Sequence, residues 1–182
     1  SQSGGHPTNN IAKWNGTGWS NLEEGINGIV YALATDRSGN LYVGGHFTRA
    51  GGYPANSVAK WDGKHWSTLG ADTCDDYIRA LVVDAAGNLY AVRTFQKPGE
   101  DPANYIARWN GQEWSNLKFP SGYSSDVRAL AIDERGNLWV ARYFGLEYWD
   151  GTEWRNLSDW SGQGLSYGIN DTLASDIPGY PP

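Results

Sequence analysis

A repeated tryptophan motif constrains the fold of this chain more than any other feature of its sequence. The motif Ile-Ala-Lys-Trp-Asn-Gly at residues 11–16 recurs with small changes at residues 58–63 and 106–111, and in a looser form at residues 146–151. A second tryptophan follows the first by five residues in every copy. The first tryptophans stand at positions 14, 61, 109 and 149, so the copies are spaced by 47, 48 and 40 residues. Periodicity of this length indicates stacked copies of one supersecondary unit.

A second repeated motif lies between the tryptophan motifs and predicts a hairpin. The pattern Asp-x-x-Gly-Asn-Leu, followed by Tyr or Trp, occurs at residues 36–42, 84–90 and 133–139. Its Gly-Asn pair suits a tight turn, and the Asn-Gly or Asp-Gly pair after each first tryptophan is a second hairpin signal. In the best-defined unit these turns separate four predicted strands, at residues 30–34, 41–44, 58–61 and 66–69. Four antiparallel strands repeated at this period predict an all-β fold, a β-propeller built of about four four-stranded repeats.

The repeat boundaries predict one propeller domain, or a segment of one, over residues 1–182. We expect complete blades at about residues 29–69, 77–117 and 126–157, and a split blade made of residues 4–22 and 168–182. Residues 4–14 align with residues 51–61, so the first blade starts without its first two strands, which we call the inner strands of a repeat.

Two ways of completing the ring stay open. Leu173-Ala174-Ser175-Asp176 is similar to Leu33-Ala34-Thr35-Asp36 and offers one inner strand for a four-bladed ring. Because no Gly-Asn-Leu-Tyr strand follows it, we favour two associated half-rings, with seven or eight blades in total. An open half-ring exposes strand edges, so self-association of the chain is expected.

The tryptophans are expected to pack between blades. Small residues in the Val-x-Ala-Leu strands, such as Ala32 and Ala34, suit the narrow inner end of a blade, which leaves the tryptophan pairs to fill the wider outer gap. The alternative is a row of exposed platforms on which sugars stack.

The long connections define the predicted binding surface. Alternate connections of an antiparallel sheet lie at opposite ends, so residues 44–57, 95–105, 70–77, 118–126 and 158–168 share one end, which we call the loop face. Variable loops on a rigid scaffold are the usual place for recognition. The candidate ligand-binding residues on the loop face are His46, Arg49, Tyr53, Asp75, Asp76, Tyr77, Tyr105, Tyr123, Asp126, Trp160 and Tyr167.

Charge and motif content exclude several functions. The net charge is −6 and the 14 basic residues form no run, which argues against nucleic acid as a partner. No apolar run approaches the roughly 20 residues of a membrane span, so no membrane insertion is expected. No phosphate loop, dinucleotide fingerprint, zinc signature or nucleophile elbow occurs, so we expect no cofactor and no catalytic residue. The aspartates at residues 72–76 lack the full calcium-loop pattern, and no metal site is predicted.

The two motifs resemble known propeller repeats. The segments Ile-Ala-Lys-Trp-Asn-Gly and Gly-Asn-Leu-Tyr-Val-Gly-Gly are similar to repeats of large secreted bacterial proteins and of the fungal cortical marker for cell polarity. Residues 127–140 resemble the propeller repeat of bacterial two-component regulators. The resemblance covers roughly residues 4–157. It implies a propeller used as an interaction scaffold and an extracellular or periplasmic location, with a bacterial source.

Three functions remain in competition at this point. The leading hypothesis is a non-enzymatic, extracytoplasmic binding or structural module with a protein or glycan at the loop face. The second is a carbohydrate-binding lectin with one aromatic site per blade. The third is a glycoside hydrolase or lyase in which acids of separate blades converge. All three occur on propellers, so the fold does not decide between them.

Overall fold

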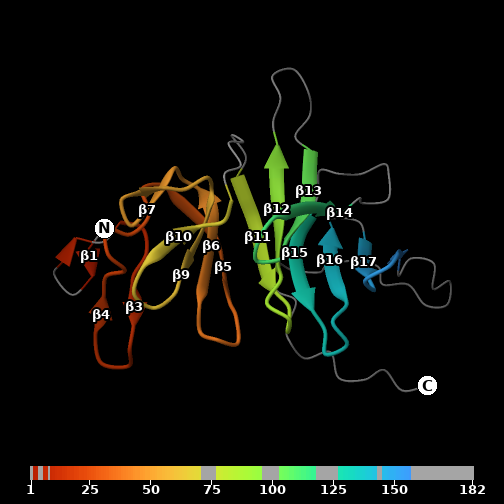
Figure 1. Cartoon of the computed structure of the whole chain (residues 1–182), viewed down its shortest axis with the longest axis horizontal. Coiled ribbons are helices and arrows are strands. Elements are labelled where there is room, and N and C mark those ends of the chain that lie inside the picture. The colour runs from red at the N-terminus through yellow and green to blue at the C-terminus, as the bar shows by residue number, and fades with distance from the viewer. Residues whose placement is uncertain are drawn as a thin grey trace. The chain divides into compact units, whose positions relative to one another are not determined.

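The computed structural model describes residues 2–3, 6–7, 9–70, 77–95, 103–117, 127–142 and 145–156. Within these ranges the regular structure consists of strands and bridges, and no helix occurs, which confirms the predicted all-β fold. The chain divides into two compact units, Ser1–Ser125 and Asp126–Pro182, and each is described by itself (Figure 1).

The main elements are three antiparallel sheets of four strands. Sheet 1 consists of β5 (Ile29–Thr35), β6 (Leu41–His46), β9 (Val58–Trp61) and β10 (Trp66–Thr68). Sheet 2 consists of β11 (Tyr77–Val83), β12 (Leu89–Phe95), β13 (Ala103–Trp109) and β14 (Trp114–Leu117). Sheet 3, in the second unit, consists of β15 (Val127–Ile132), β16 (Leu138–Arg142), β17 (Gly145–Trp149) and β18 (Trp154–Asn156). In every sheet the strands follow one another across the sheet in chain order, as the two hairpin motifs predict.

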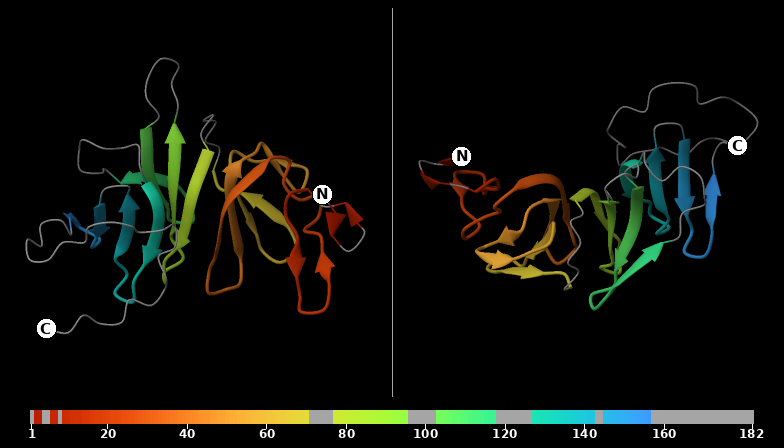
Figure 2. Two further views of the ribbon diagram at one scale, coloured as in Figure 1. Left: turned by 180° about the vertical axis from the view of Figure 1, so that it is seen from behind. Right: turned by 90° about the horizontal axis from the view of Figure 1, so that it is seen from above.

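Three two-stranded hairpins accompany sheet 1 in the first unit. They are β1 (Gln2–Ser3) with β2 (His6–Pro7), β3 (Lys13–Trp14) with β4 (Trp19–Ser20), and β7 (Arg49–Ala50) with β8 (Tyr53–Pro54). The pairing of Trp14 with Trp19 repeats the pairing of Trp61 with Trp66 in sheet 1. Figure 2 shows the β3–β4 hairpin beside sheet 1, where β3 and β4 correspond to the two outer strands β9 and β10.

The aspartate of each Asp-x-x-Gly-Asn motif closes the turn between the inner strands. In sheet 1 the Oδ1 atom of Asp36 accepts the backbone N–H groups of Ser38 and Asn40, both at 2.9 Å. Its Oδ2 atom accepts a hydrogen bond from the Asn40 side chain at 2.7 Å. Asp84 and Asp133 accept the equivalent bonds in sheets 2 and 3. The glycine of the turn has φ near +80°, a conformation that L residues rarely adopt, which explains why the motif needs it.

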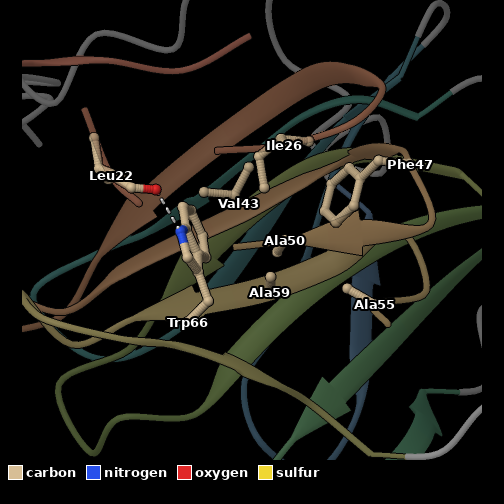
Figure 3. Packing of buried hydrophobic residues seen from close by; sticks show 8 residues of the cluster. All are labelled: Leu22, Ile26, Val43, Phe47, Ala50, Ala55, Ala59 and Trp66. Atoms are coloured by element: carbon tan, nitrogen blue, oxygen red, sulfur yellow. Dashed lines mark hydrogen bonds between the residues drawn. The ribbon is translucent and has the colours of Figure 1, made fainter. Parts of the chain in front are cut away.

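Two apolar clusters cover the two faces of sheet 1. One face, with Val43, Ala59 and Trp66, packs against Leu22 and Ile26 of the preceding segment (Figure 3). The other face packs against sheet 2, and its cluster contains Tyr42, Val58, Leu69, Ile78, Leu81, Leu89 and Ala91. Sheet 1 therefore lies in the first unit between sheet 2 on one face and the N-terminal segment on the other.

In the first unit, a tryptophan hydrogen bond links each of the repeats of sheets 1 and 2 to the repeat before it. The indole N–H of Trp66 donates to the backbone carbonyl of Leu22 at 2.8 Å, and that of Trp114 donates to the carbonyl of Leu69 at 2.7 Å. Leu22 and Leu69 both stand three residues after the second tryptophan of their own repeat. These bonds and the surrounding clusters confirm that the tryptophans of sheets 1 and 2 pack between repeats.

The first tryptophan pair departs from that expectation. Trp14 and Trp19 stack against each other with ring centroids 5.5 Å apart, as the later pairs do. Both are nevertheless about half exposed, whereas Trp66 is buried. Trp14 and Trp19 share their sequence motif with the buried pairs but are not buried themselves. The reason is that no described segment covers them in the way that the N-terminal segment covers Trp66.

Candidate functional site

At the end of the sheets that carries the Asp-x-x-Gly-Asn turns, the polar side chains stabilise the turns themselves. Burial raises the pKa of Asp36, but hydrogen bonds from Asn40, Ser38 and Tyr42 lower it by more, so the net pKa is below its usual value. Burial raises the pKa of the Tyr42 phenol, and the nearby Asp36 carboxylate raises it further. These carboxylates already accept several hydrogen bonds within their own turns, so this end offers few groups to a ligand.

The opposite end of sheets 1 and 2 is the loop face, and an aromatic cluster lies there. Tyr77 begins β11, and its ring centroid is 6.0 Å from that of Tyr31 on β5 and 6.5 Å from that of His46 at the end of β6. The guanidinium of Arg79 lies 5.5 Å from the centre of the Tyr77 ring and donates a long hydrogen bond, 3.4 Å, to the Tyr77 hydroxyl. We call Tyr31, His46, Tyr77 and Arg79 the inner cluster, since β5, β6 and β11 are inner strands.

Bulges position two members of the inner cluster. The register between the inner strands shifts between Val30 and Ala32 in sheet 1 and between Ile78 and Ala80 in sheet 2, so Tyr31 and Arg79 are the extra residues. A bulge turns a side chain away from the regular alternation of a strand and often does so at functional sites. Tyr31, His46 and Arg79 are exposed, while Tyr77 is partly buried among them. The cluster therefore presents aromatic faces and a guanidinium to solvent.

Two of the sequence-predicted site residues belong to the inner cluster, and three others do not. His46 and Tyr77 are brought together as described. Arg49 and Tyr53 lie on the β7–β8 hairpin, where Arg49 donates to the carbonyl of Gly52 at 2.8 Å. Tyr105 is exposed on β13, the third strand of sheet 2.

The remaining predicted site residues lie outside the described part of the chain. These are Asp75, Asp76, Tyr123, Asp126, Trp160 and Tyr167. The acidic residues of segment 72–76 lie outside it as well. Among the residues that the structure describes, no group of three or more His, Cys, Asp or Glu side chains is placed to hold a metal ion. The same residues include no helix long and apolar enough to cross a membrane.

Sequence reasoning missed Tyr31 and Arg79. Both occupy the second position of the Val-x-Ala-Leu motif, which begins with Ile78 in sheet 2, and Arg128 occupies the same position in sheet 3, at a third bulge. The signal that identifies them is a large aromatic or charged side chain at the second position of an otherwise small, aliphatic strand. Regular alternation gives no reason to place that position in a site, because the bulge decides where the side chain points.

A buried ion pair in the second unit was missed too. Arg142 on β16 donates to Glu147 on β17 at 3.0 Å, and both side chains are nearly buried. Glu147 occupies the position of Ala59 and Ala107 in the earlier repeats, both fully buried. The Oε1 atom of Glu147 is paired, and its buried Oε2 atom has no partner among the described residues.

Comparison with known proteins identifies the fold. No protein-family model and no curated protein matches the sequence. A structure of YCF48 bound to a D1 peptide superposes with a TM-score of 0.56 and 19% identity, over 79% of this chain and 44% of that one. A streptogramin B lyase structure superposes with a TM-score of 0.53 and 14% identity, over 70% of this chain and 39% of that one. A catalytically inactive virginiamycin B lyase from Staphylococcus aureus with quinupristin superposes with a TM-score of 0.50 and 13% identity, over 70% of this chain and 40% of that one.

These neighbours are β-propellers, and the chain is built of β-propeller repeats, as its sequence predicts. At identities below 20% the likeness shows the fold alone. The chain spans about two-fifths of the length of the structures it matches.

Proposed function

We propose that this chain is a non-enzymatic, extracytoplasmic binding module that holds a polypeptide partner at the loop face, with the inner cluster as the contact. The observation that carries the proposal is the position of Tyr77, whose ring touches Tyr31, His46 and Arg79 from two adjacent sheets. Clustered tyrosine and arginine side chains are the residue types that dominate the energetics of protein interfaces.

The chemistry of the cluster favours a particular kind of partner. The tyrosine rings offer apolar area at low entropic cost, because each has few rotatable bonds. The Arg79 guanidinium is exposed beside the Tyr77 ring, and it recognises carboxylates through its planar fork of donors. The partner that suits the inner cluster is a polypeptide segment in which apolar side chains adjoin an acidic group.

The fold likeness adds support of a general kind. The YCF48 structure contains a bound peptide, so a propeller of similar fold holds a polypeptide segment. The resemblance to repeats of secreted bacterial proteins supports the extracytoplasmic location. The two lyase structures keep an enzymatic alternative in competition, and a lectin remains the other alternative.

An array experiment separates peptide binding from glycan binding. The whole chain is applied to an array of 15-residue peptides, in which apolar sequences occur with and without Asp and Glu, and in parallel to a glycan array. We expect peptides with acidic and apolar residues to bind and the glycans not to bind.

Point variants then locate the contact. Each of the single variants Arg79→Ala and Tyr77→Ala is expected to weaken peptide binding about tenfold or more, as hot-spot truncations do. Tyr53→Ala is the matched control, because Tyr53 is an exposed tyrosine of the same unit outside the inner cluster. Equal binding by all variants overturns the proposed contact, and glycan binding that Tyr77→Ala abolishes establishes the lectin instead. Thermal melts of each variant identify any loss caused by unfolding.

A further inference from the structure

Tyr31 and Tyr77 bring two tyrosine rings of different sheets into contact. Tyr31 lies on β5 of sheet 1 and Tyr77 begins β11 of sheet 2, and their ring centroids are 6.0 Å apart with the ring planes inclined at 58°. A separation of this size is typical of aromatic rings that touch each other. The other ring contacts in the described part of the chain pair two tryptophans, tryptophan with tyrosine, or tyrosine with histidine. Within that part, this is therefore the one contact between two tyrosines.

The packing of sheet 1 against sheet 2 holds the two rings in place. Gly44, on the strand next to β5, lies so close to sheet 2 that an added Cβ would stand 2.5 Å from a methyl group of Ile78. Ile78 follows Tyr77 directly in β11 and is buried. Tyr31 is the bulged residue of β5, and the residues on both sides of it pair with β6. Both rings thus belong to packed strands, which keeps them in contact in the folded chain.

Solvent reaches this pair of rings. Tyr31 is 51% exposed, and Tyr77 is partly buried among Tyr31, His46 and Arg79. An oxidant in solution therefore meets Tyr31 directly and reaches Tyr77 through the ring that touches it. The 182 residues include one cysteine, so no disulfide within them joins the two sheets.

We propose that Tyr31 and Tyr77 form a site of oxidative cross-linking, at which a dityrosine bond joins sheet 1 to sheet 2. The oxidant is hydrogen peroxide, used by a haem peroxidase that removes single electrons from phenols. Each phenol loses one electron and its hydroxyl proton, and the two radicals couple through the ring carbons adjacent to the carbons that bear the oxygens. Each coupled carbon then loses its hydrogen as a proton and the phenol oxygen regains one, which restores both aromatic rings. Two C–H bonds are thereby replaced by one C–C bond, and hydrogen peroxide takes up two electrons and two protons to give two molecules of water.

Coupling within the chain is favoured because the two rings are already in contact. Reacting groups held next to each other react much faster than groups that must meet by diffusion, as the tyrosines of two separate chains must. Positions 31 and 77 are 46 residues apart, so the bond closes a long loop in the unfolded chain. Closing such a loop lowers the conformational entropy of the unfolded chain, as a disulfide does. The cross-link is expected to stabilise the first unit and to hold sheets 1 and 2 together at the loop face.

Oxidation of the dilute chain tests the proposal. The 182-residue chain is treated with hydrogen peroxide and a haem peroxidase, the single-chain fraction is isolated in denaturant, and cross-links are located by mass spectrometry after proteolysis. We expect this fraction to show dityrosine fluorescence and to be lighter than the untreated chain by two hydrogen atoms. One pair of linked peptides, containing Tyr31 and Tyr77, is expected. The melting temperature of the refolded product is expected to rise by about 5–15 °C.

Conservative variants identify the tyrosines that react. Tyr31→Phe and Tyr77→Phe each keep the ring and remove the phenol, so each is expected to fold as the parent chain does and to lose the cross-link. Tyr53→Phe is the matched control, because Tyr53 is 64% exposed and contacts no tyrosine ring among the residues described. It is expected to give as much cross-link as the parent chain. Oxidation in concentrated urea, where the rings are no longer held together, is expected to abolish the selectivity for this pair.

Three results would overturn the proposal. The first is a single-chain fraction of the parent chain without dityrosine. The second is an equal yield of cross-link from the parent chain and from Tyr31→Phe. The third is dityrosine confined to dimers and reduced by Tyr53→Phe, which would assign the reaction to exposed tyrosines of colliding chains.

Discussion

Replacing Trp66 with phenylalanine tests how consecutive repeats are held together. The indole N–H donates to the Leu22 carbonyl at 2.8 Å, and both residues are buried. Phenylalanine keeps an aromatic ring but has no N–H, so the Leu22 carbonyl is left buried without its partner. Leaving a buried acceptor unpaired costs about 1–3 kcal/mol. The smaller ring also leaves unfilled volume, which adds roughly 1 kcal/mol.

The expected loss of unfolding free energy is therefore about 2–4 kcal/mol, a large share of the 5–15 kcal/mol typical of a domain. Trp19→Phe is the matched control, because Trp19 occupies the same repeat position and is 54% exposed. Its expected cost is about 0.5 kcal/mol, as for other surface substitutions. Urea unfolding followed by near-ultraviolet circular dichroism measures both, with the slope m compared between variants. Equal costs for the two variants would refute the argument, because they would show that the hydrogen bond and the burial contribute nothing measurable.

Three further predictions concern packing, acid stability and the buried ion pair. Gly44→Ala is expected to destabilise the first unit by about 1–3 kcal/mol, because the added methyl group would clash with the Ile78 side chain. An unchanged melting temperature would contradict the close packing of sheets 1 and 2. The pKa of Asp36 is lower in the folded than in the unfolded state. The ionised carboxylate therefore contributes its full stability above the unfolded pKa near 3.9, and this contribution is lost as the pH falls through the folded pKa. Asp36→Asn is expected to flatten the pH dependence of the urea midpoint below about pH 4. Glu147→Gln is expected to lower the unfolding free energy by about 1.5–3 kcal/mol, because it removes the charged acceptor of the buried hydrogen bond from Arg142. A thermal melt measures the loss, and a variant as stable as the parent chain would contradict a stabilising ion pair.

The regular part of the fold could be predicted because its determinants are local. The Asp36 turn needs only residues 36–42, and the same seven-residue pattern produces the same hydrogen bonds at Asp84 and Asp133. The four strands of sheet 1 lie where the hairpin signals place them. Each of these features is decided within a few residues, so a repeated sequence gives a repeated structure.

Burial at the first tryptophan pair could not be predicted, because it depends on a segment elsewhere. Trp14 and Trp61 have nearly identical flanking sequences, and both stack on a second tryptophan in the same way. Trp61 packs against the cluster around Ile26 and Val43, whereas Trp14 is half exposed. A pattern that specifies a strand does not specify what lies over it.

The inner cluster was found only in part for a related reason. His46 and Tyr77 were predicted because they belong to long connections, and loop position is visible in a sequence. Tyr31 and Arg79 lie within strands, where alternation assigns each side chain to one face of the sheet or the other. The bulge breaks that alternation, and its position emerges from the pairing of β5 with β6 and of β11 with β12.

The bulges also explain how one repeat can carry a specific site. In the Val-x-Ala-Leu strand the small and aliphatic positions pack between sheets, so a change there disturbs the contact with the neighbour. The bulged position is released from that contact, and it carries Tyr31, Arg79 or Arg128, whereas the positions around it keep small or aliphatic residues. Repetition of the packing positions preserves the fold, and variation at the single bulged position changes the chemistry at the loop face. Tyr31→Arg is therefore expected to change which partners bind and to leave the unfolding free energy of the first unit within about 0.5 kcal/mol of the parent value.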